Sequence, residues 1–370
     1  MKIWKRLSSG LFALVLLASL SCAALAAEPK TENAAPKPAG QFSQWFPDMG
    51  VNPEAPEASE AVLARMGTAI QQTKTAGSET LTLNGAVWNG GSVRLSLTAK
   101  SPSLPTVVDQ YTWLNSEGCT ARIPEEQWKA YVKNKVESES DGSKEKRVQR
   151  FQYLMEQGQG QRELNPNLGV VSREGDTVQL TASMVLDAYL EKPEITLHIE
   201  NVEITGQGAE QPGTRSGDYL LKGPFEFTFT LDKLLPSVNY KGNLQATIKK
   251  MPVRITAASI SSTQISTGYA LDVKGTVNVI HRGQDPVPGA TNLDMDKDLN
   301  MRLEGVWTKD GKYVTCSGFS VQGVMTGTKG EPITGHLGQN FPYPIDPAAV
   351  TAVDISGTRV ELSGLERTAE

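Results

Sequence analysis

The stretch TLTLNGAVWNGGSVRLSLTAK, residues 80–100, alternates apolar and polar side chains on both sides of a short turn sequence. Leucine alternates with threonine in the first run, and valine or leucine alternates with polar residues in the second. Asn89-Gly90-Gly91 stands between the runs, and these residue types tolerate the positive φ that a tight turn requires. The stretch therefore predicts a β-hairpin with one face on a core.

Similar alternating runs follow along the chain. They predict strands over residues 177–185, 194–204, 225–231, 243–250, 252–262, 268–281, 300–321 and 350–362. Asp310-Gly311 marks a second hairpin turn. Many short strands separated by Gly, Pro and Asn, without strand-helix-strand spacing, indicate sandwiches rather than a parallel sheet. We expect a mainly β chain with two immunoglobulin-like β-sandwich domains in tandem, over residues 61–235 and 236–370.

Residues 124–158 interrupt the alternation of the first domain. Apolar residues at helical spacing follow Pro124, and a second helical run ends near Gly158, which can act as a C-terminal cap. We expect a helical insertion in the first sandwich. Such insertions often carry the individual function of a protein, because connecting segments tolerate change better than the scaffold does.

The N-terminus has the pattern of a secretory signal peptide. Basic residues precede an apolar run, and the small residues at 24–26 predict cleavage after Ala26. Cys22 offers lipidation as an alternative anchor, although Ser19 stands where a lipobox usually carries leucine. No later apolar run reaches the roughly 20 residues that a spanning helix needs. We expect a signal peptide at 1–26 and a secreted or cell-envelope protein without a transmembrane segment after cleavage.

Residues 27–60 are rich in Pro, Ala, Glu and Lys, a composition typical of a flexible linker. The aromatic island FSQWF at 42–46 either docks this linker onto the folded body or binds a partner. The segment EASEAVLARM, residues 57–66, has the pattern of a short helix that leads into the first domain.

The charge balance excludes one class of function. The chain has 370 residues, with 36 Lys and Arg against 41 Asp and Glu, and signal cleavage takes its formal net charge from −5 to −8. A nucleic-acid binder would carry a basic footprint instead. Such a charge also repels anionic wall polymers unless cations intervene. With three Cys in all, the chain is not a disulfide-dense scaffold.

Four groups of residues carry a resemblance to a known family. They are ETLTLNGAVWNGGSVRLSLTAKSP (79–102), EITLHIENVEI (194–204) with LKGPFEFTFTLDK (221–233), VRITAASISSTQ (253–264) and PYPIDPAAVTAVDISGTRVEL (342–362). In turn they resemble an extracytoplasmic domain of unknown function, often followed by an immunoglobulin-like domain, in Firmicute membrane proteins of the anti-sigma-factor type. The resemblance covers most of residues 68–364.

This sequence departs from that family at its N-terminus. Members that sequester a sigma factor need a cytoplasmic domain before a transmembrane helix, and here only about six residues precede the apolar run. The resemblance therefore implies the extracytoplasmic sensing or binding module alone. It carries over no functional residues.

The two cysteines that follow the signal peptide have two interpretations. Cys119 and Cys316 either form a disulfide that links the two domains or remain buried thiols, which behave as small apolar residues.

Three carboxylates at period two form a candidate metal site. Asp294, Asp296 and Asp298 resemble the start of a calcium loop, but Leu299 and Gly305 stand where the loop needs glycine and glutamate. The alternative is a polar approach to the next strand. The three histidines are isolated, without zinc spacing, and His198 is expected on the solvent face of its strand.

A candidate partner surface lies on the helical insertion. It consists of Trp128, Lys129, Lys133, Arg147 and Arg150. A basic face there would contact a wall polymer or an acidic partner, and the alternative is a solvated face of mixed charge.

The sequence contains none of the catalytic motifs that have local signatures. We expect an exported, non-enzymatic module for envelope sensing or protein interaction, without cofactor, whose partner is an envelope protein or a wall component. The first alternative is a carbohydrate-binding module, which would expose coplanar tryptophans drawn from Trp45, Trp88, Trp113, Trp128 and Trp307. The second is a secreted hydrolase whose acid pair meets only in the fold.

Overall fold

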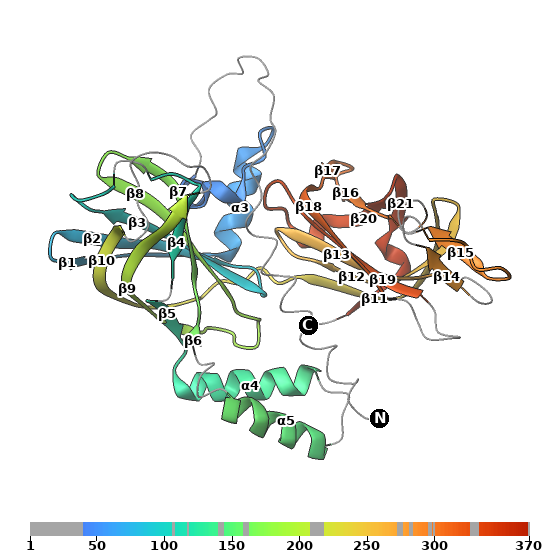
Figure 1. Cartoon of the computed structure of the whole chain (residues 1–370), viewed down its shortest axis with the longest axis horizontal. Helices are drawn as coiled ribbons and strands as arrows, with labels where there is room; N and C mark the ends of the chain where they lie inside the picture. Colours follow the sequence, from blue (N-terminus) through green and yellow to red (C-terminus); the bar gives the residue numbers. More distant parts are fainter. Residues whose placement is uncertain are drawn as a thin grey trace. The chain divides into compact units, whose positions relative to one another are not determined.

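The structure is a computed structural model. It describes residues 40–105, 108–116, 118–139, 144–157, 163–207, 218–271, 277–280, 284–294, 298, 300–325 and 333–368. These residues form two compact units that divide between Pro236 and Ser237 (Figure 1). The signal peptide expected at 1–26, with Cys22, lies outside the described residues.

The fold class expected from the sequence is confirmed at the level of tandem β-sandwich units that are mainly β. A helical insertion interrupts the first unit. Of the helices that the structure describes, none combines the length and the apolar composition needed to cross a membrane.

The first unit contains two antiparallel sheets. One has the strand order β1-β2-β3-β8-β7, and the other has the order β10-β9-β5-β6 with β4 paired to β9. The strands are β1 (Gly67–Ala76), β2 (Glu79–Trp88), β3 (Ser92–Lys100), β4 (Thr112–Asn115), β5 (Cys119–Arg122), β6 (Glu163–Leu164), β7 (Asn167–Glu174), β8 (Thr177–Val185), β9 (Glu194–Gln207) and β10 (Tyr219–Thr230). The sheets are linked where Gln72 Nε2 on β1 donates a hydrogen bond to the Thr228 carbonyl on β10, at 2.9 Å.

The hairpin predicted around Asn89 is confirmed. Trp88 on β2 pairs with Val93 on β3, and Gly90 adopts a φ of 87° in the turn. The Asn89 Oδ1 atom accepts a hydrogen bond from the Ser92 N–H at 2.8 Å, which holds the turn closed. The alternation therefore sends the leucines of both strands to one face.

That face forms the larger core. Leu81, Leu83, Leu95 and Leu97 are fully buried, together with aromatic residues of β10 such as Phe227. Truncating one such leucine to alanine typically costs about 2–5 kcal/mol. This core is the scaffold on which the insertion docks.

The structure differs from the flexible linker expected over residues 27–60. Its second half contains α2 (Gln41–Trp45), the 3-10 helix η1 (Pro47–Met49) and the start of α3 (Pro56–Met66). Phe42 and Phe46 are buried with Leu63 in a small cluster against β2. The composition of the segment predicted a flexible linker incorrectly, because three aromatic residues within five positions bury the apolar surface that Pro and Ala do not. The aromatic island thus packs onto the first unit.

The second unit contains a six-stranded and a four-stranded antiparallel sheet, with a separate parallel pair. The orders are β18-β19-β13-β12-β11-β22, β17-β16-β20-β21 and β14-β15. The strands are β11 (Val238–Ile248), β12 (Met251–Ile260), β13 (Gln264–Leu271), β14 (Val277–Ile280), β15 (Thr291–Asp294), β16 (Leu303–Thr308), β17 (Tyr313–Thr315), β18 (Ser317–Met325), β19 (Ile333–Asn340), β20 (Val350–Ile355), β21 (Thr358–Glu361) and β22 (Glu366–Thr368). The 3-10 helices η2 (Pro347–Ala349) and η3 (Leu362–Gly364) flank β20 and β21.

The second predicted hairpin is also present. Trp307 on β16 pairs with Tyr313 on β17, and Gly311 has a φ of 78° in the turn between them. Val306 of the same strand is fully buried in a core that belongs to the second unit.

Candidate interaction surface on the helical insertion

Helix α4 (Glu125–Glu139) is built to lie on the core of the first unit. Trp128, Tyr131, Val132 and Val136 recur at helical spacing, and all four are buried in that core. Acidic residues occupy the first turn, where a carboxylate favours the positive end of the helix dipole. The helix therefore has one apolar face that fixes its position.

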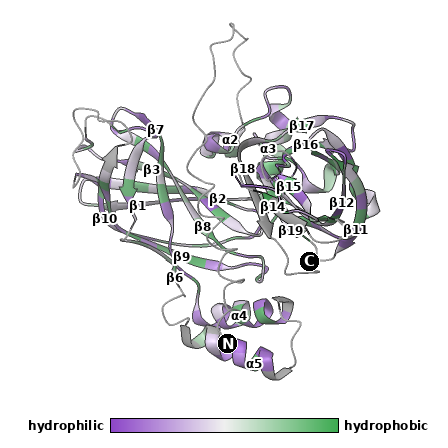
Figure 2. Ribbon diagram, turned by 45° about the vertical axis from the view of Figure 1, so that its right-hand side comes forward, coloured by the Kyte–Doolittle hydropathy of each residue, from purple (hydrophilic) through white to green (hydrophobic). Residues whose placement is uncertain are grey.

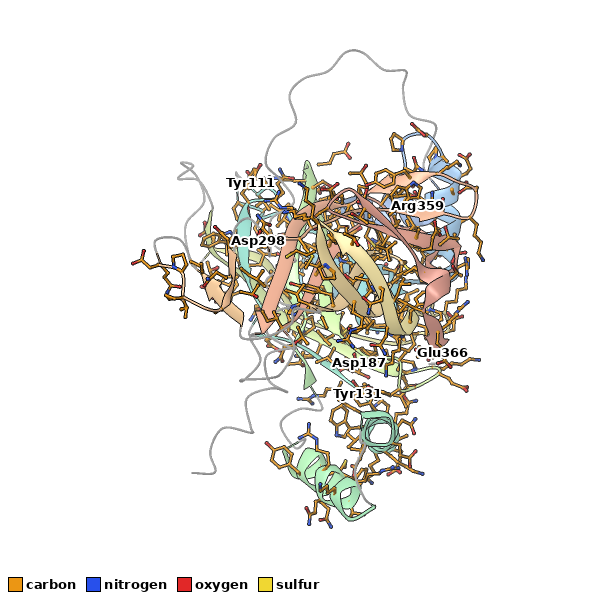
Figure 3. The ribbon with its side chains drawn as sticks, turned by 90° about the vertical axis from the view of Figure 1, so that its right-hand side faces the viewer. Tyr111, Tyr131, Asp187, Asp298, Arg359 and Glu366 are labelled. Atoms are coloured by element: carbon orange, nitrogen blue, oxygen red, sulfur yellow. The ribbon has the colours of Figure 1, made fainter. Side chains whose placement is uncertain are left out.

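Polar contacts fasten α4 to the segment between β8 and β9. Tyr131 donates a hydrogen bond from its hydroxyl to Asp187 Oδ2 at 3.1 Å, and Lys135 Nζ lies 3.5 Å from the same oxygen. Asn134 Nδ2 donates to the Tyr189 carbonyl at 2.7 Å. Figure 3 shows Tyr131 and Asp187 next to each other where the sandwich meets α4. Burial, and then the charge of Asp187, raise the pKa of Tyr131, so its hydroxyl remains a donor.

Helix α5 (Lys144–Gln157) lies against α4 and presents its opposite side to solvent. Phe151 and Met155 are partly buried against the core. With 3.6 residues per turn, Lys146, Arg150 and Tyr153 fall within about 60° of one another on the side away from Phe151 and Met155. These three side chains are exposed.

We call Lys146, Arg147, Arg150 and Tyr153 the basic face of α5. The Arg150 guanidinium lies 5.6 Å from the centre of the Tyr153 ring, a cation–π distance. Tyr153 is 51% exposed. The sequence of α5 contains Lys144, Lys146, Arg147 and Arg150 against Glu145 and Glu156, so the helix is cationic overall. Figure 2 colours this helix largely hydrophilic.

The structure contradicts the exposure of one residue of the partner surface predicted from the sequence. Trp128 does not contribute to that surface, because it is only 8% exposed and stacks on Tyr131, with ring centres 5.3 Å apart. Lys129 lies 3.1 Å from Glu125 and 2.9 Å from Glu126, and the hydrogen bonds to these two carboxylates raise its pKa. The helical spacing of Trp128 with Tyr131 already predicts its burial.

The remaining predicted residues are exposed. Lys133 lies on α4, and Arg147 and Arg150 lie on α5. Sequence reasoning missed Tyr153 as part of the same surface. Its spacing from Lys146 and Arg150, at seven and three positions, is the signal that could have found it.

The disulfide considered between Cys119 and Cys316 is not formed, and both thiols are free. Cys119 is buried in the core of the first unit, whereas Cys316 packs partly buried on the core of the second. A side chain enclosed in one core does not meet a thiol of another. Burial raises the pKa of each thiol to about 12.

The calcium-loop candidate has a local structural explanation. Asp298 Oδ2 accepts a hydrogen bond from the Asp294 N–H at 2.8 Å, and the Asp298 N–H donates to the Asp294 carbonyl. Asp296 lies outside the described residues. Over the described part of the chain, no three His, Cys, Asp or Glu side chains come together to hold a metal ion.

His198 lies on the outer face of β9, as the alternation predicts. Its Nε2 atom is 3.0 Å from Glu200 Oε2, and its Nδ1 atom is 4.0 Å from Glu226 Oε2. His336 belongs to β19, and His281 is outside the described residues.

The five tryptophans do not line one sheet face. Trp88 is fully buried and donates from its indole N–H to the Leu186 carbonyl at 2.9 Å. Trp45 packs in the cluster around α2, and Trp307 is covered by the Arg359 guanidinium at 4.8 Å. Trp113 on β4, by contrast, is 63% exposed.

Comparisons with known proteins add one distant structural likeness. No family model matches the chain, and no curated protein matches it significantly. A crystal structure of a conserved domain protein from Bacillus anthracis aligns with 80% of this chain and 79% of its own, at 9% identity and a TM-score of 0.35.

Proposed function

We propose that this protein is an exported, non-enzymatic interaction module of the cell envelope that binds an acidic protein segment through the basic face of α5. The observation that carries the proposal is the concentration of Lys146, Arg147 and Arg150 around the exposed Tyr153. The signal-peptide pattern and the resemblance to an extracytoplasmic sensing domain support the location and the class.

The charge of the rest of the chain makes this surface distinctive. The whole protein is acidic, at −5, so a cationic helix face differs in sign from its surroundings. Complementary charge steers association and selects partners more than it adds affinity. Exposed Tyr and Arg are also the residue types enriched at the centres of protein interfaces.

The apolar part of the face favours a peptide over a purely anionic polymer. The Tyr153 ring is about half exposed and adjoins the cations. A partner that carries apolar and acidic side chains together would cover both, whereas a polyphosphate chain would leave the apolar groups in water. We therefore infer an acidic protein segment with interspersed apolar residues.

Binding of defined probes tests this proposal. We expect the full chain to bind a synthetic peptide of alternating Glu-Leu and Asp-Ile pairs, measured by fluorescence anisotropy, and to bind it more weakly as salt is raised. The double variant Lys146→Glu/Arg150→Glu should weaken binding at least 10-fold. The matched control Lys74→Glu/Lys192→Glu changes the same charge on exposed lysines of the first unit and should stay within 2-fold.

Two results would contradict the proposal. An equal loss of peptide affinity in the control variant would show that binding depends only on the net charge of the protein. Equal affinity for polyglycerol phosphate would instead assign the face to a wall polymer.

A second candidate, glycan binding, is favoured by the aromatic residues before and on β4. Tyr111, in the turn before β4, is 48% exposed, and Trp113 on β4 is 63% exposed. Aromatic faces of this kind stack on sugar rings. Retention on purified peptidoglycan should then fall in Trp113→Ala and persist in the control Tyr153→Ala. Equal retention of both variants would exclude this function for Trp113.

A further inference from the structure

An open pocket lies in the first unit between a turn and a strand. Its volume is about 590 Å³, and it is lined by residues 75–79 around the β1–β2 turn and by residues 222–224 of β10. Pockets of a few hundred to a thousand Å³ are typical of small-molecule sites. None of the residues of the basic face contributes to it, so this inference is independent of the proposed function.

Glu79 is the unusual residue of this pocket. It begins β2 in phase with Leu81 and Leu83, so the alternation turns its side chain toward the core, and it is only 5% exposed. Its Oε1 atom accepts one long hydrogen bond from the Ser103 hydroxyl, at 3.3 Å. Its Oε2 atom is buried and has no hydrogen-bond partner among the described residues. Buried polar groups are normally hydrogen-bonded, because burying one without a partner costs free energy. The Glu79 carboxyl group therefore has room for a hydrogen-bond partner from a ligand.

Lys222, a residue of opposite charge, also lines this pocket. Its side chain is exposed, and its Nζ atom lies 5.1 Å from the centre of the Tyr219 ring. In the part of the chain that the structure describes, no carboxylate comes within ion-pair distance of this ammonium. The residues that line the pocket therefore include one carboxyl group and one ammonium group, each without an ion-pair partner among the described residues.

We propose that this pocket binds a small zwitterion, an amino acid or short peptide whose ammonium group meets Glu79 and whose carboxylate meets Lys222. A metal ion would find one carboxylate where it needs several oxygen ligands. A simple cation would be repelled by Lys222, and a simple anion by Glu79, whereas a zwitterion satisfies both. The terminal torsion of a glutamate is broad, so a small turn exchanges its two oxygens in front of a ligand.

The position of Glu79 fits a residue retained for binding. Leucine there would continue the stripe of Leu81 and Leu83 and would remove a buried polar group. Residues that lower stability in this way are common at binding sites. Glu79→Leu should accordingly raise the melting temperature while it abolishes ligand binding.

Calorimetric titration of the full chain tests the proposal with glycine, dialanine and trialanine as probes. We expect saturable heat with at least one of them, and at least a 10-fold loss of affinity in both Glu79→Gln and Lys222→Met. Lys74→Met, a matched change on exposed β1, should stay within 2-fold. Acetylation of the amine of the bound probe should lower its affinity at least 10-fold, and amidation of its carboxylate should do the same, because each change removes one of the two charges.

Three results would overturn the proposal. The first is the absence of heat with all three probes. The second is unchanged affinity in Glu79→Gln or Lys222→Met, with circular dichroism confirming that the variants fold. The third is a lower melting temperature for Glu79→Leu, which would make Glu79 a structural residue. None of these results affects the peptide bound by α5, whose variants leave this pocket intact.

Discussion

Glu60 shows how one side chain can hold a separate segment in place. From α3 its carboxylate accepts hydrogen bonds from the N–H groups of Phe42 and Ser43, at 3.0 and 2.8 Å, and from the Ser43 hydroxyl at 2.7 Å. These donors belong to the first turn of α2 and have no partner within the helix. No local sequence pattern indicates a contact between residues 17 positions apart. The contact of Glu60 with α2 therefore could not be predicted from the sequence.

Glu60→Ala should destabilise the first unit by about 1–3 kcal/mol, because it leaves partly buried donors without an acceptor. Urea unfolding followed by tryptophan fluorescence would measure the change. Glu57→Ala, an exposed position in the first turn of the same helix, is the matched control and should stay within about 0.5 kcal/mol. A Glu60 effect no larger than that of the control would show that α2 is held by its aromatic residues alone.

The two buried thiols predict a specific response to alkaline pH. Their pKa is raised from 9.0 to about 12, so the folded state keeps protons that the unfolded state releases. The stability that the thiols contribute is therefore complete below pH 9 and is lost as pH rises from 9 toward 12. The free energy of unfolding should fall less steeply over this range in Cys119→Ala than in the wild type. Parallel pH profiles would contradict the burial of this thiol.

At the scale of elements, period and contact explain both what the sequence predicted and what it missed. The alternation of apolar and polar residues predicts the strands correctly because each sheet has one face on a core. Helical spacing found α4, and the same spacing shows that Trp128 faces inward with Tyr131. Glu79 was not predicted from the sequence, although it is an acid in phase with Leu81 and Leu83 on the same strand. The structured half of the linker was missed because composition does not report which few aromatic residues find a surface.

The aromatic island makes the strongest prediction for an element. Phe46 is fully buried, and Gly85 on β2 leaves room for Trp45, since a Cβ at that glycine would come within 2.9 Å of the indole. Phe46→Ala should cost about 3–5 kcal/mol through lost apolar contact and the cavity that remains. Tyr111→Ala removes an exposed ring and should cost no more than about 0.5 kcal/mol. Comparable unfolding midpoints for the two variants would show that residues 40–60 behave as a linker after all.

At the scale of the molecule, the sequence predicts architecture better than function. Repeated alternation with turn residues needs only local pattern, and it predicts tandem sandwiches. The basic face depends on which side of α5 the core covers, and the pocket depends on a turn meeting a strand more than 140 positions away. Such encounters are set by tertiary packing, which spacing along one chain does not encode.

The separate cores imply that each unit folds by itself. The buried cluster that contains Leu83 draws only on residues before 237, and the cluster that contains Val306 draws only on residues after it. Residues that share one core unfold together. The fragments 38–236 and 237–370, with one core each, should therefore each give a single sigmoidal unfolding transition in circular dichroism. A cut at 220 is the control, because it removes most of β10 with Phe225 and Phe227 from the first core. The fragment 38–220 should therefore aggregate or remain unfolded. If 38–236 also fails to fold while the full chain folds, then stability depends on contacts between the units, and the division at 236 does not mark a folding boundary.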